Sequence, residues 1–238
     1  MPVQTTFKRV ELKYMVDPAQ KAAIMAGAAD RLQPDAFGPV SIRNIYFDTD
    51  NYRLIRSSLE KPVYKEKLRL RSYGPAEPDS DIFVELKKKY KSVVYKRRLA
   101  LSQREAESCF MENRPLPAES QIAREIDYFR SFYGQLSPAV FLSYDREAFL
   151  ACDSSGLRLT FDRNILYRQH DMSLCAPVWG RELLPAGMTL MEIKVSGAMP
   201  LWLAELLSRQ HVYKSSFSKY GAAYMDIFRC WEGGLLYA

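Results

Sequence analysis

The sequence has few of the residues on which several common catalytic sites depend. Its only histidines are His170 and His211, and neither has an obvious serine or cysteine nucleophile as a partner. A hydrolase built on a catalytic triad is therefore not expected. The chain also lacks GxGxxG and GxxxxGKS/T motifs, which argues against a Rossmann or P-loop nucleotide site.

Cysteine is also scarce, and the four residues form no recognisable pattern. Cys109, Cys152, Cys175 and Cys230 include no CxxC pair, and none lies near a histidine at the spacing of a metal finger. We therefore expect reduced thiols in a cytoplasmic protein. No apolar run approaches the roughly 18–20 residues that a membrane helix needs, so a membrane role would require a partner.

The composition indicates a folded protein that favours anionic partners. The 238 residues are 47% hydrophobic and include 15 tyrosines, which is enough for a sizeable core and is typical of a β-rich fold. We expect one domain over residues 1–238. Lysine and arginine total 34 against 28 acidic residues, a net charge of +6. The excess is modest, so the local placement of the charges matters more than their sum.

Several predicted strands carry charge at every second position. The clearest of these segments are Lys67–Arg71, Val84–Lys87, Arg158–Asp162 and Met191–Val195. Residues i, i+2 and i+4 of a strand share one face, so each segment has an apolar face and a charged, mostly positive face. The repetition favours a curved or closed sheet whose basic interior holds a polyanion. The alternative is an ordinary sheet with one face in water.

The order of the predicted elements indicates an α+β fold. Strands are expected at residues 7–16, 40–48, 67–73, 83–88, 93–99, 139–150, 156–166 and 188–195. Helices are expected at residues 18–32, from 102, at 122–133, at 200–209 and from 218. About eight strands in hairpin-like order with five helices are unlike the regular alternation of a parallel α/β sheet.

Three groups of residues are candidates for binding phosphate or metal. Arginine guanidinium groups at Arg69, Arg71, Arg146 and Arg158 suit phosphate oxygens. Glu192 has two interpretations, either a salt bridge to an arginine or a ligand for Mg²⁺ or Mn²⁺. Glu85 and Glu11 are weaker candidates for the same metal role.

The start of the last predicted helix is a further candidate. Ser218 and Lys219 lie where free backbone N–H groups bind phosphate, although simple capping by Ser218 also explains the serine. The basic run Lys87–Lys91 is open to two interpretations, a solvated strand end or a contact with polyphosphate or nucleic acid.

Taken in order, these motifs resemble the VTC-type polyphosphate polymerase domain of the CYTH, or triphosphate tunnel metalloenzyme, superfamily. The resemblance extends from about Phe7 to Phe228. It rests on Glu11–Tyr14, Ile45–Asp48, Leu68–Gly74, Val84–Lys87, Tyr144–Phe149, Leu157–Asp162, Met191–Lys194 and Phe217–Tyr220.

The resemblance implies an eight-stranded antiparallel β tunnel with helices packed outside. The phosphate-contacting catalytic residues that it implies are Arg69, Arg71, Lys87, Arg146, Arg158 and Lys219. The supporting binding residues that it implies are Lys13, Lys96, Tyr144, Lys194 and Ser218. Glu192 would be the ligand of a divalent metal, Mn²⁺ or Mg²⁺.

The implied activity is ATP-dependent polyphosphate polymerisation, a phosphotransferase reaction that adds the γ-phosphoryl group of ATP to inorganic polyphosphate and releases ADP. ATP and polyphosphate are the expected partners, nucleic acid is not expected, and a membrane partner stays open. Where classical tunnel phosphatases carry ExExK, this chain has Arg9 through Lys13, without the first glutamate. That loss agrees with the polymerase branch. The alternatives are a metal-dependent tripolyphosphatase or nucleoside triphosphatase, and a non-catalytic module that binds polyphosphate or inositol phosphates.

Overall fold

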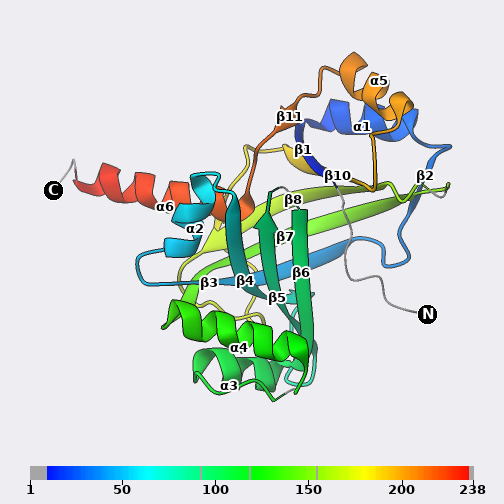
Figure 1. The fold of residues 1–238 in the computed structure, drawn as a ribbon. Coiled ribbons are helices and arrows are strands. Elements are labelled where there is room, and N and C mark those ends of the chain that lie inside the picture. The colour runs from blue at the N-terminus through cyan, green and yellow to red at the C-terminus, as the bar shows by residue number, and fades with distance from the viewer. Residues whose placement is uncertain (1–9, 92, 118, 154, 236–238) are drawn as a thin grey trace. The chain divides into compact units, whose positions relative to one another are not determined.

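The chain folds into two compact units that exchange segments along the sequence. The computed structural model describes residues 10–91, 93–117, 119–153 and 155–235 (Figure 1). Arg9 and the start of the strand expected from Phe7 lie outside these residues. The first unit comprises residues 1–41, 144–165 and 182–217, and the second comprises residues 42–143, 166–181 and 218–238. The single domain expected over residues 1–238 stays a prediction.

The first unit is a sheet with two helices. Its elements are β1 (Val10–Val16), α1 (Pro18–Gly27), β2 (Leu32–Pro34), β10 (Thr189–Val195), α5 (Leu201–Arg209), β11 (Lys214–Ser215) and parts of β7 (Ser137–Ala151) and β8 (Arg158–Arg168). The strand order is β11-β1-β10-β8-β7, with β2 against β7 and β9 (Arg181–Glu182) against β8. The β1–β10 and β10–β8 pairings are antiparallel.

One face of this sheet is apolar, and α1 and α5 pack on it. Phe161 and Ile193 share a core with Ile24 of α1 and Leu203 of α5. Figure 1 shows the two helices side by side. The intervening strand positions, which include Glu192, lie on the opposite face. The predicted alternation of apolar and charged residues is confirmed for the described part of the first strand.

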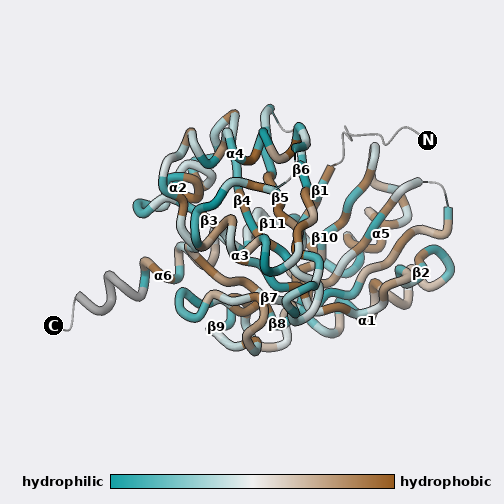
Figure 2. The backbone as a smooth tube through the Cα atoms, turned by 90° about the horizontal axis from the view of Figure 1, so that it is seen from below, coloured by the Kyte–Doolittle hydropathy of each residue, from teal (hydrophilic) through white to brown (hydrophobic). Residues whose placement is uncertain are grey.

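The second unit is a larger sheet with four helices. Its elements are β3 (Val40–Asp48), α2 (Arg53–Leu59), β4 (Tyr64–Tyr73), β5 (Asp81–Tyr90), β6 (Val93–Ser102), α3 (Gln103–Met111), α4 (Gln121–Tyr133), α6 (Lys219–Leu235) and the first half of β7. The strand order is β7-β3-β4-β5-β6, and the β3–β4, β4–β5 and β5–β6 pairings are antiparallel. In Figure 2 hydrophilic and hydrophobic stretches follow one another along β4, β5 and β6.

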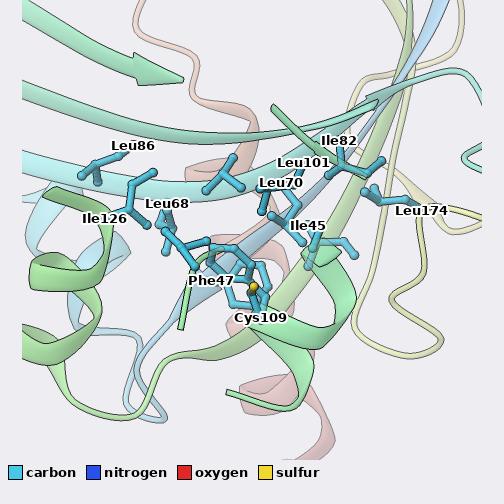
Figure 3. Packing of buried hydrophobic residues seen from close by; sticks show 14 of the residues in the cluster. Ile45, Phe47, Leu68, Leu70, Ile82, Leu86, Leu101, Cys109, Ile126 and Leu174 are labelled. Carbon is cyan, nitrogen blue, oxygen red and sulfur yellow. The ribbon is translucent and has the colours of Figure 1, made fainter. Parts of the chain in front are cut away.

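Helices α3 and α4 cover the apolar face of the second sheet. Leu68, Leu86 and Phe47 point from the strands toward Ile126 of α4 and Cys109 of α3 (Figure 3). All five side chains are buried. Because strand residues alternate, this packing leaves the charged positions of the same strands on the other face.

The expected α+β class with an antiparallel sheet is confirmed, whereas closure is not seen. The described residues form eleven strands. Eight of these have seven or more residues, which agrees with the predicted number. The others, β2, β9 and β11, have only two or three residues. The hydrogen-bonded order ends at β11 and at β6, so pairing between described strands does not close the sheet.

Local capping signals placed most helix starts correctly. Asp17 and Ser102 form capping boxes at α1 and α3, and Gly134 ends α4 with φ +72°. The first helix ends at Gly27 rather than near Leu32 as predicted. A Cβ atom at Gly27 would lie 2.8 Å from a methyl carbon of Leu206, so this glycine allows α5 to approach closely.

Helix α2 was not predicted, because its cap comes from the preceding strand and not from the N-cap residue. Tyr52, at the N-cap position, has φ +56° and its side chain makes no capping bond. The carboxylate of Asp48 accepts instead from the backbone N–H groups of Leu54 and Ile55, at 2.8 and 3.0 Å. Asp48 is fully buried and also accepts from the hydroxyl of Tyr220 in α6, at 2.8 Å. One side chain thus joins β3 to two helices.

We expect Asp48→Asn to lower the free energy of unfolding by about 1–3 kcal/mol, because an amide cannot accept from all of these donors. Asp50→Asn, at an exposed position in the adjacent turn, is the matched control. Urea unfolding followed by circular dichroism measures both variants. Equal stability of the two variants would contradict the assigned role of Asp48.

Candidate functional site

The charged face of the second unit is organised around one buried carboxylate, that of Glu85. Its oxygens lie 2.6 Å from Arg69 Nη2, 2.6 Å from Lys96 Nζ and 2.9 Å from Arg98 Nε. Arg71 is farther, at 3.9 Å. The Glu85 side chain is 1% exposed. We call these five residues the Glu85 cluster. Its net charge is positive, as an anion-binding surface requires.

Strand register brings the Glu85 cluster together. Arg69 of β4 and Arg98 of β6 lie directly opposite Glu85 of β5. Arg71 lies two residues from Arg69, on the same face. Its Nε donates to the side-chain carbonyl of Asn44, which lies opposite it in β3, at 3.0 Å. The guanidinium groups are therefore held in fixed positions before any ligand binds.

The cluster changes the protonation behaviour of its members. Burial alone would raise the pKa of Glu85, but Arg69, Arg71 and Lys96 hold that pKa well below its usual range. Burial lowers the pKa of Lys96 to about 8, against the opposing effect of Glu85. This occurs although much of the Lys96 side chain is exposed. Glu85 is therefore a fixed negative charge, and the lowered pKa of Lys96 is about 8.

The N-terminus of α6 adjoins the same face through two tyrosines. The rings of Tyr46 and Tyr220 stack with centroids 4.8 Å apart. Arg69 donates to the Tyr46 hydroxyl at 2.7 Å. Although burial opposes it, Arg69, Arg71 and Lys219 lower the pKa of Tyr46, which places Lys219 within electrostatic reach of the cluster. The ring stack thus links the helix start to the arginines.

Ser218 caps α6, and Lys67 contacts the cap. The Ser218 hydroxyl accepts from the backbone N–H of Gly221 at 3.3 Å and from Lys67 Nζ at 3.2 Å. The expected capping is therefore confirmed. A lysine at a helix N-terminus, together with the positive end of the helix dipole, makes this end attractive to phosphate.

The first unit has a second charged cluster, around Glu192. Its carboxylate lies 3.2 Å from Arg146 Nη2, 3.6 Å from Lys13 Nζ and 3.9 Å from Lys194 Nζ. Lys13 lies directly opposite Glu192 in the β1–β10 register. The Glu192 side chain is only 7% exposed. The salt-bridge interpretation of Glu192 is therefore correct in this structure, and it does not exclude a metal.

Arg146 is held by a further buried carboxylate that we did not single out from the sequence. Asp162 accepts from Arg146 Nε and Nη2, both at 2.6 Å, and is fully buried. The guanidinium carbon lies 5.2 Å from the ring centre of Tyr144. Burial opposes the charge of Arg146, but Tyr144, Asp162 and Glu192 raise its pKa well above the usual value. Arg146 is therefore a permanent, immobilised cation.

Two buried polar atoms beside Glu192 have no hydrogen-bond partner among the described residues. They are the Thr160 hydroxyl oxygen and Arg158 Nε. Thr160 lies directly opposite Glu192 in the β10–β8 register, and Arg158 lies opposite Lys194. The Arg158 guanidinium turns to Asp35, at 3.1 Å, rather than to Glu192. Buried polar atoms normally find partners, so both atoms are candidate contacts for a bound ligand.

These residues fit a divalent metal that arrives together with a phosphate substrate. No group of three or more histidine, cysteine or acidic side chains in the described residues could hold a metal alone. Magnesium, however, is often bound by one carboxylate with substrate phosphates and water. Glu192 and the Thr160 hydroxyl provide oxygens for that arrangement. The nearby Lys13 and Arg146 disfavour a bare cation, so substrate anions are part of the fit.

The residues implied by the resemblance fall into two groups. The first unit contains Lys13, Tyr144, Arg146, Arg158, Glu192 and Lys194, and the second contains Arg69, Arg71, Lys87, Lys96, Ser218 and Lys219. Tyr46, Lys67, Arg98 and Asp162 were not identified as site residues. Lys67 and Arg98 could have been, since both lie on the period-2 faces of the candidate cations. The role of Tyr46 depends on α6 and could not be read from spacing.

Comparison with known proteins identifies a family and a fold. The VTC domain family matches residues 8–228. The structure resembles a candidate adenylate cyclase from Bacillus halodurans, with 16% identity, a TM-score of 0.55, and coverage of 90% of this chain and 96% of the other. No curated protein matches significantly.

A second solved structure has a similar fold. It is a candidate adenylyl cyclase from Hippeastrum with a dominant triphosphatase activity, 16% identical with a TM-score of 0.52, and the match covers 89% of this chain and 93% of the other. The family resemblance drawn from the motifs is confirmed by the match of the VTC domain family to residues 8–228. Within the described part of the chain, no helix has the length and apolar character needed to cross a membrane.

We expect Glu85→Gln to lower the free energy of unfolding by about 2–4 kcal/mol. Four clustered cations lose their shared carboxylate, and water screens the repulsion among them only in part because they are partly buried. Adding tripolyphosphate should restore more stability to this variant than to the wild type, since an anion then replaces the lost charge. Thermal unfolding with and without the anion measures both effects.

Glu77→Gln, at an exposed loop position, is the control for this experiment. If Glu85→Gln behaved like Glu77→Gln in both conditions, Glu85 would not be the centre of an anion-binding cluster.

Proposed function

This chain belongs to the VTC domain family, and from that premise we propose that it is an ATP-dependent polyphosphate polymerase. An oxygen of the terminal phosphate of the acceptor chain attacks the γ-phosphorus of ATP. The bond from that phosphorus to the bridging oxygen breaks, and ADP leaves with the electron pair. The product is polyphosphate longer by one unit.

The observation that carries this proposal is the lowered pKa of Glu85, which is paired with the cations of its cluster. The only carboxylate of the cluster has a pKa far below neutrality and accepts from arginines and a lysine. A group with such a pKa is a poor general base. Hydrolysis benefits from a base that activates water, whereas a phosphate acceptor is already an oxyanion. The cluster therefore suits transfer to phosphate better than transfer to water.

The second unit supplies fixed positive charge in this proposal. Arg69 and Arg71 bind the phosphates of ATP through guanidinium forks, and Lys87 and Lys96 add point charges. Lys219, with Ser218 and the start of α6, binds a further phosphate. Phosphoryl transfer depends mainly on alignment and on stabilising charge on the equatorial oxygens. Groups held in place before the substrate binds provide both.

In the first unit we assign phosphate binding to Arg146, Arg158, Lys13 and Lys194, with Tyr144 supporting Arg146. Asp162 and Glu192 anchor Arg146, Glu192 also pairs with Lys13 and Lys194, and Asp35 pairs with Arg158. Glu192 and the Thr160 hydroxyl would hold the divalent metal, Mg²⁺ or Mn²⁺. When bound, that metal neutralises charge on phosphate oxygens.

Two other functions are kept as alternatives. The similar structure from Hippeastrum has a dominant triphosphatase activity, which makes hydrolysis of tripolyphosphate or a nucleoside triphosphate the second candidate. The third is a non-catalytic module that binds polyphosphate or inositol phosphates. ATP and polyphosphate as partners, a location in the cytoplasm and a membrane partner that exports the product remain proposals.

We expect purified protein with ATP and Mn²⁺ or Mg²⁺ to release ADP in step with polymer and with little free phosphate. Arg69→Ala, Lys219→Ala and Glu192→Gln should each reduce turnover by roughly 10²–10³-fold without unfolding the protein. The first two remove a positive charge that stabilises the transition state, and the third removes the carboxylate proposed to hold the metal. ADP, phosphate and long-chain polyphosphate are quantified on one time course.

Glu205→Gln, on the exposed side of α5, serves as the control and should retain full turnover. ADP matched by free phosphate would make the protein a hydrolase. Tight polyphosphate binding without any turnover would make it a binding module.

We expect affinity for long-chain polyphosphate to fall by up to about tenfold between pH 7 and pH 9, since Lys96 with a pKa near 8 loses its proton over this interval. The internal phosphates of a long chain keep one charge each over the same interval. Lys96→Met should bind more weakly at pH 7 and show a flatter pH profile. Calorimetric titration at several pH values measures both, and equal slopes for the two proteins would exclude Lys96 as the titrating group.

A further inference from the structure

Strands β4, β5 and β6 place lysines directly opposite one another. Lys67 lies opposite Lys87, and Lys87 lies opposite Lys96. One step farther along the same face, Lys65 lies opposite Lys89. We call these five residues the lysine ladder. It continues the face of the Glu85 cluster toward the end of β5, away from the arginines that we assigned to the phosphates of ATP.

Opposed like charges are unfavourable in an isolated sheet. Side chains that face each other across strands lie about 4.5–5.5 Å apart, and like charges at that distance destabilise the pairing. Burial lowers the pKa of Lys65, and Lys89, Lys87 and Lys61 lower it further. Lys65 Nζ is directed by a hydrogen bond to the backbone carbonyl of Ser58, at 3.2 Å. The repulsion is therefore present in the folded chain without a ligand.

The outer end of the ladder differs from the Glu85 cluster in its counter-charge. On the shared face, β4 and β5 contribute no carboxylate beyond Glu85 in the direction of Lys65 and Lys89. The nearby acidic residue of β4, Glu66, lies on the opposite face, where it accepts from Tyr133 and pairs with Lys88. A bound polyanion would supply the missing charge.

We propose that Lys65 and Lys89 bind the distal part of an inorganic polyphosphate chain, beyond the phosphates that the arginines and Lys87 hold. This inference rests on the proposed function, because it extends the same phosphate-binding face. The ladder contains only lysines, whose ammonium groups are point charges without the fixed fork of arginine. Such contacts retain a polymer while allowing it to shift along the face by one unit.

The surroundings favour polyphosphate over a nucleic acid. Binding of single-stranded nucleic acid normally uses aromatic side chains on which bases stack. Tyr64 and Tyr90, which lie opposite each other, are next to Lys65 and Lys89 in sequence and therefore point to the other face. At this end, the described residues of β4 and β5 thus place lysines and no aromatic ring on the shared face, which matches a chain of phosphates without bases.

The test compares ligands of different length on the double variant Lys65→Gln/Lys89→Gln, without ATP or metal. We expect its affinity for long-chain polyphosphate to fall by roughly tenfold. The slope of log affinity against log salt concentration should decrease by the amount that about two lost phosphate contacts produce. Its affinity for tripolyphosphate should stay unchanged, because the short ligand occupies the arginines. Calorimetric titration at several salt concentrations measures all three quantities.

The control Arg104→Gln/Arg209→Gln removes the same charge from positions that are 72% and 74% exposed. It should leave both affinities unchanged. Thermal unfolding gives a second readout: the ladder variant should be at least as stable as the wild type, since its substitutions remove repulsion. A loss of stability would contradict the inference that these lysines repel one another in the folded protein.

Three outcomes would overturn the proposal. They are equal losses for the short and long ligands, no loss for either, and single-stranded DNA binding as tightly as polyphosphate with the same dependence on the ladder. Because binding is measured without turnover, failure of the polymerase assay would leave this result interpretable. A protein that hydrolyses ATP could still show the length-dependent affinity.

Discussion

The second unit depends on the interaction of one buried carboxylate with several cations. Glu85 fixes Arg69, Lys96 and Arg98 on a face that would otherwise repel itself. A single negative charge is enough to hold these side chains but not to neutralise them. The balance leaves an ordered surface that still attracts anions. A second carboxylate on this face would give stability at the expense of phosphate binding.

A series of contacts that begins at Asp48, the last residue of β3, holds this surface in place. Asp48 holds α2 and the hydroxyl of Tyr220. Tyr220 stacks on Tyr46, which accepts from Arg69. A buried cap, a ring stack and an arginine thus form one continuous series of contacts. The start of α6 and the Glu85 cluster are therefore both connected to Asp48 through Tyr220.

Much of the fold and many site residues followed from local patterns. Alternation at Leu68, Arg69 and Leu70 predicted both the strand and its charged face, and the capping box at Ser102 placed a helix start. Features that depend on contacts between separate helices and strands were missed. Helix α2 is capped by Asp48 from another element, and the importance of Asp162 and Tyr46 arises from packing. Spacing rules within one helix or strand do not reveal such contacts, because their partners lie in separate elements.

The alternation of core and charge also constrains how this chain can evolve. Leu68 and Leu86 pack beneath α4, while Arg69 and Glu85 occupy the other face of the same strands. Loss or gain of a single residue within β4 or β5 would exchange these faces along the rest of the strand. Length variation is therefore confined to connections such as residues 74–80. The strands of related proteins should differ by substitution and keep their length.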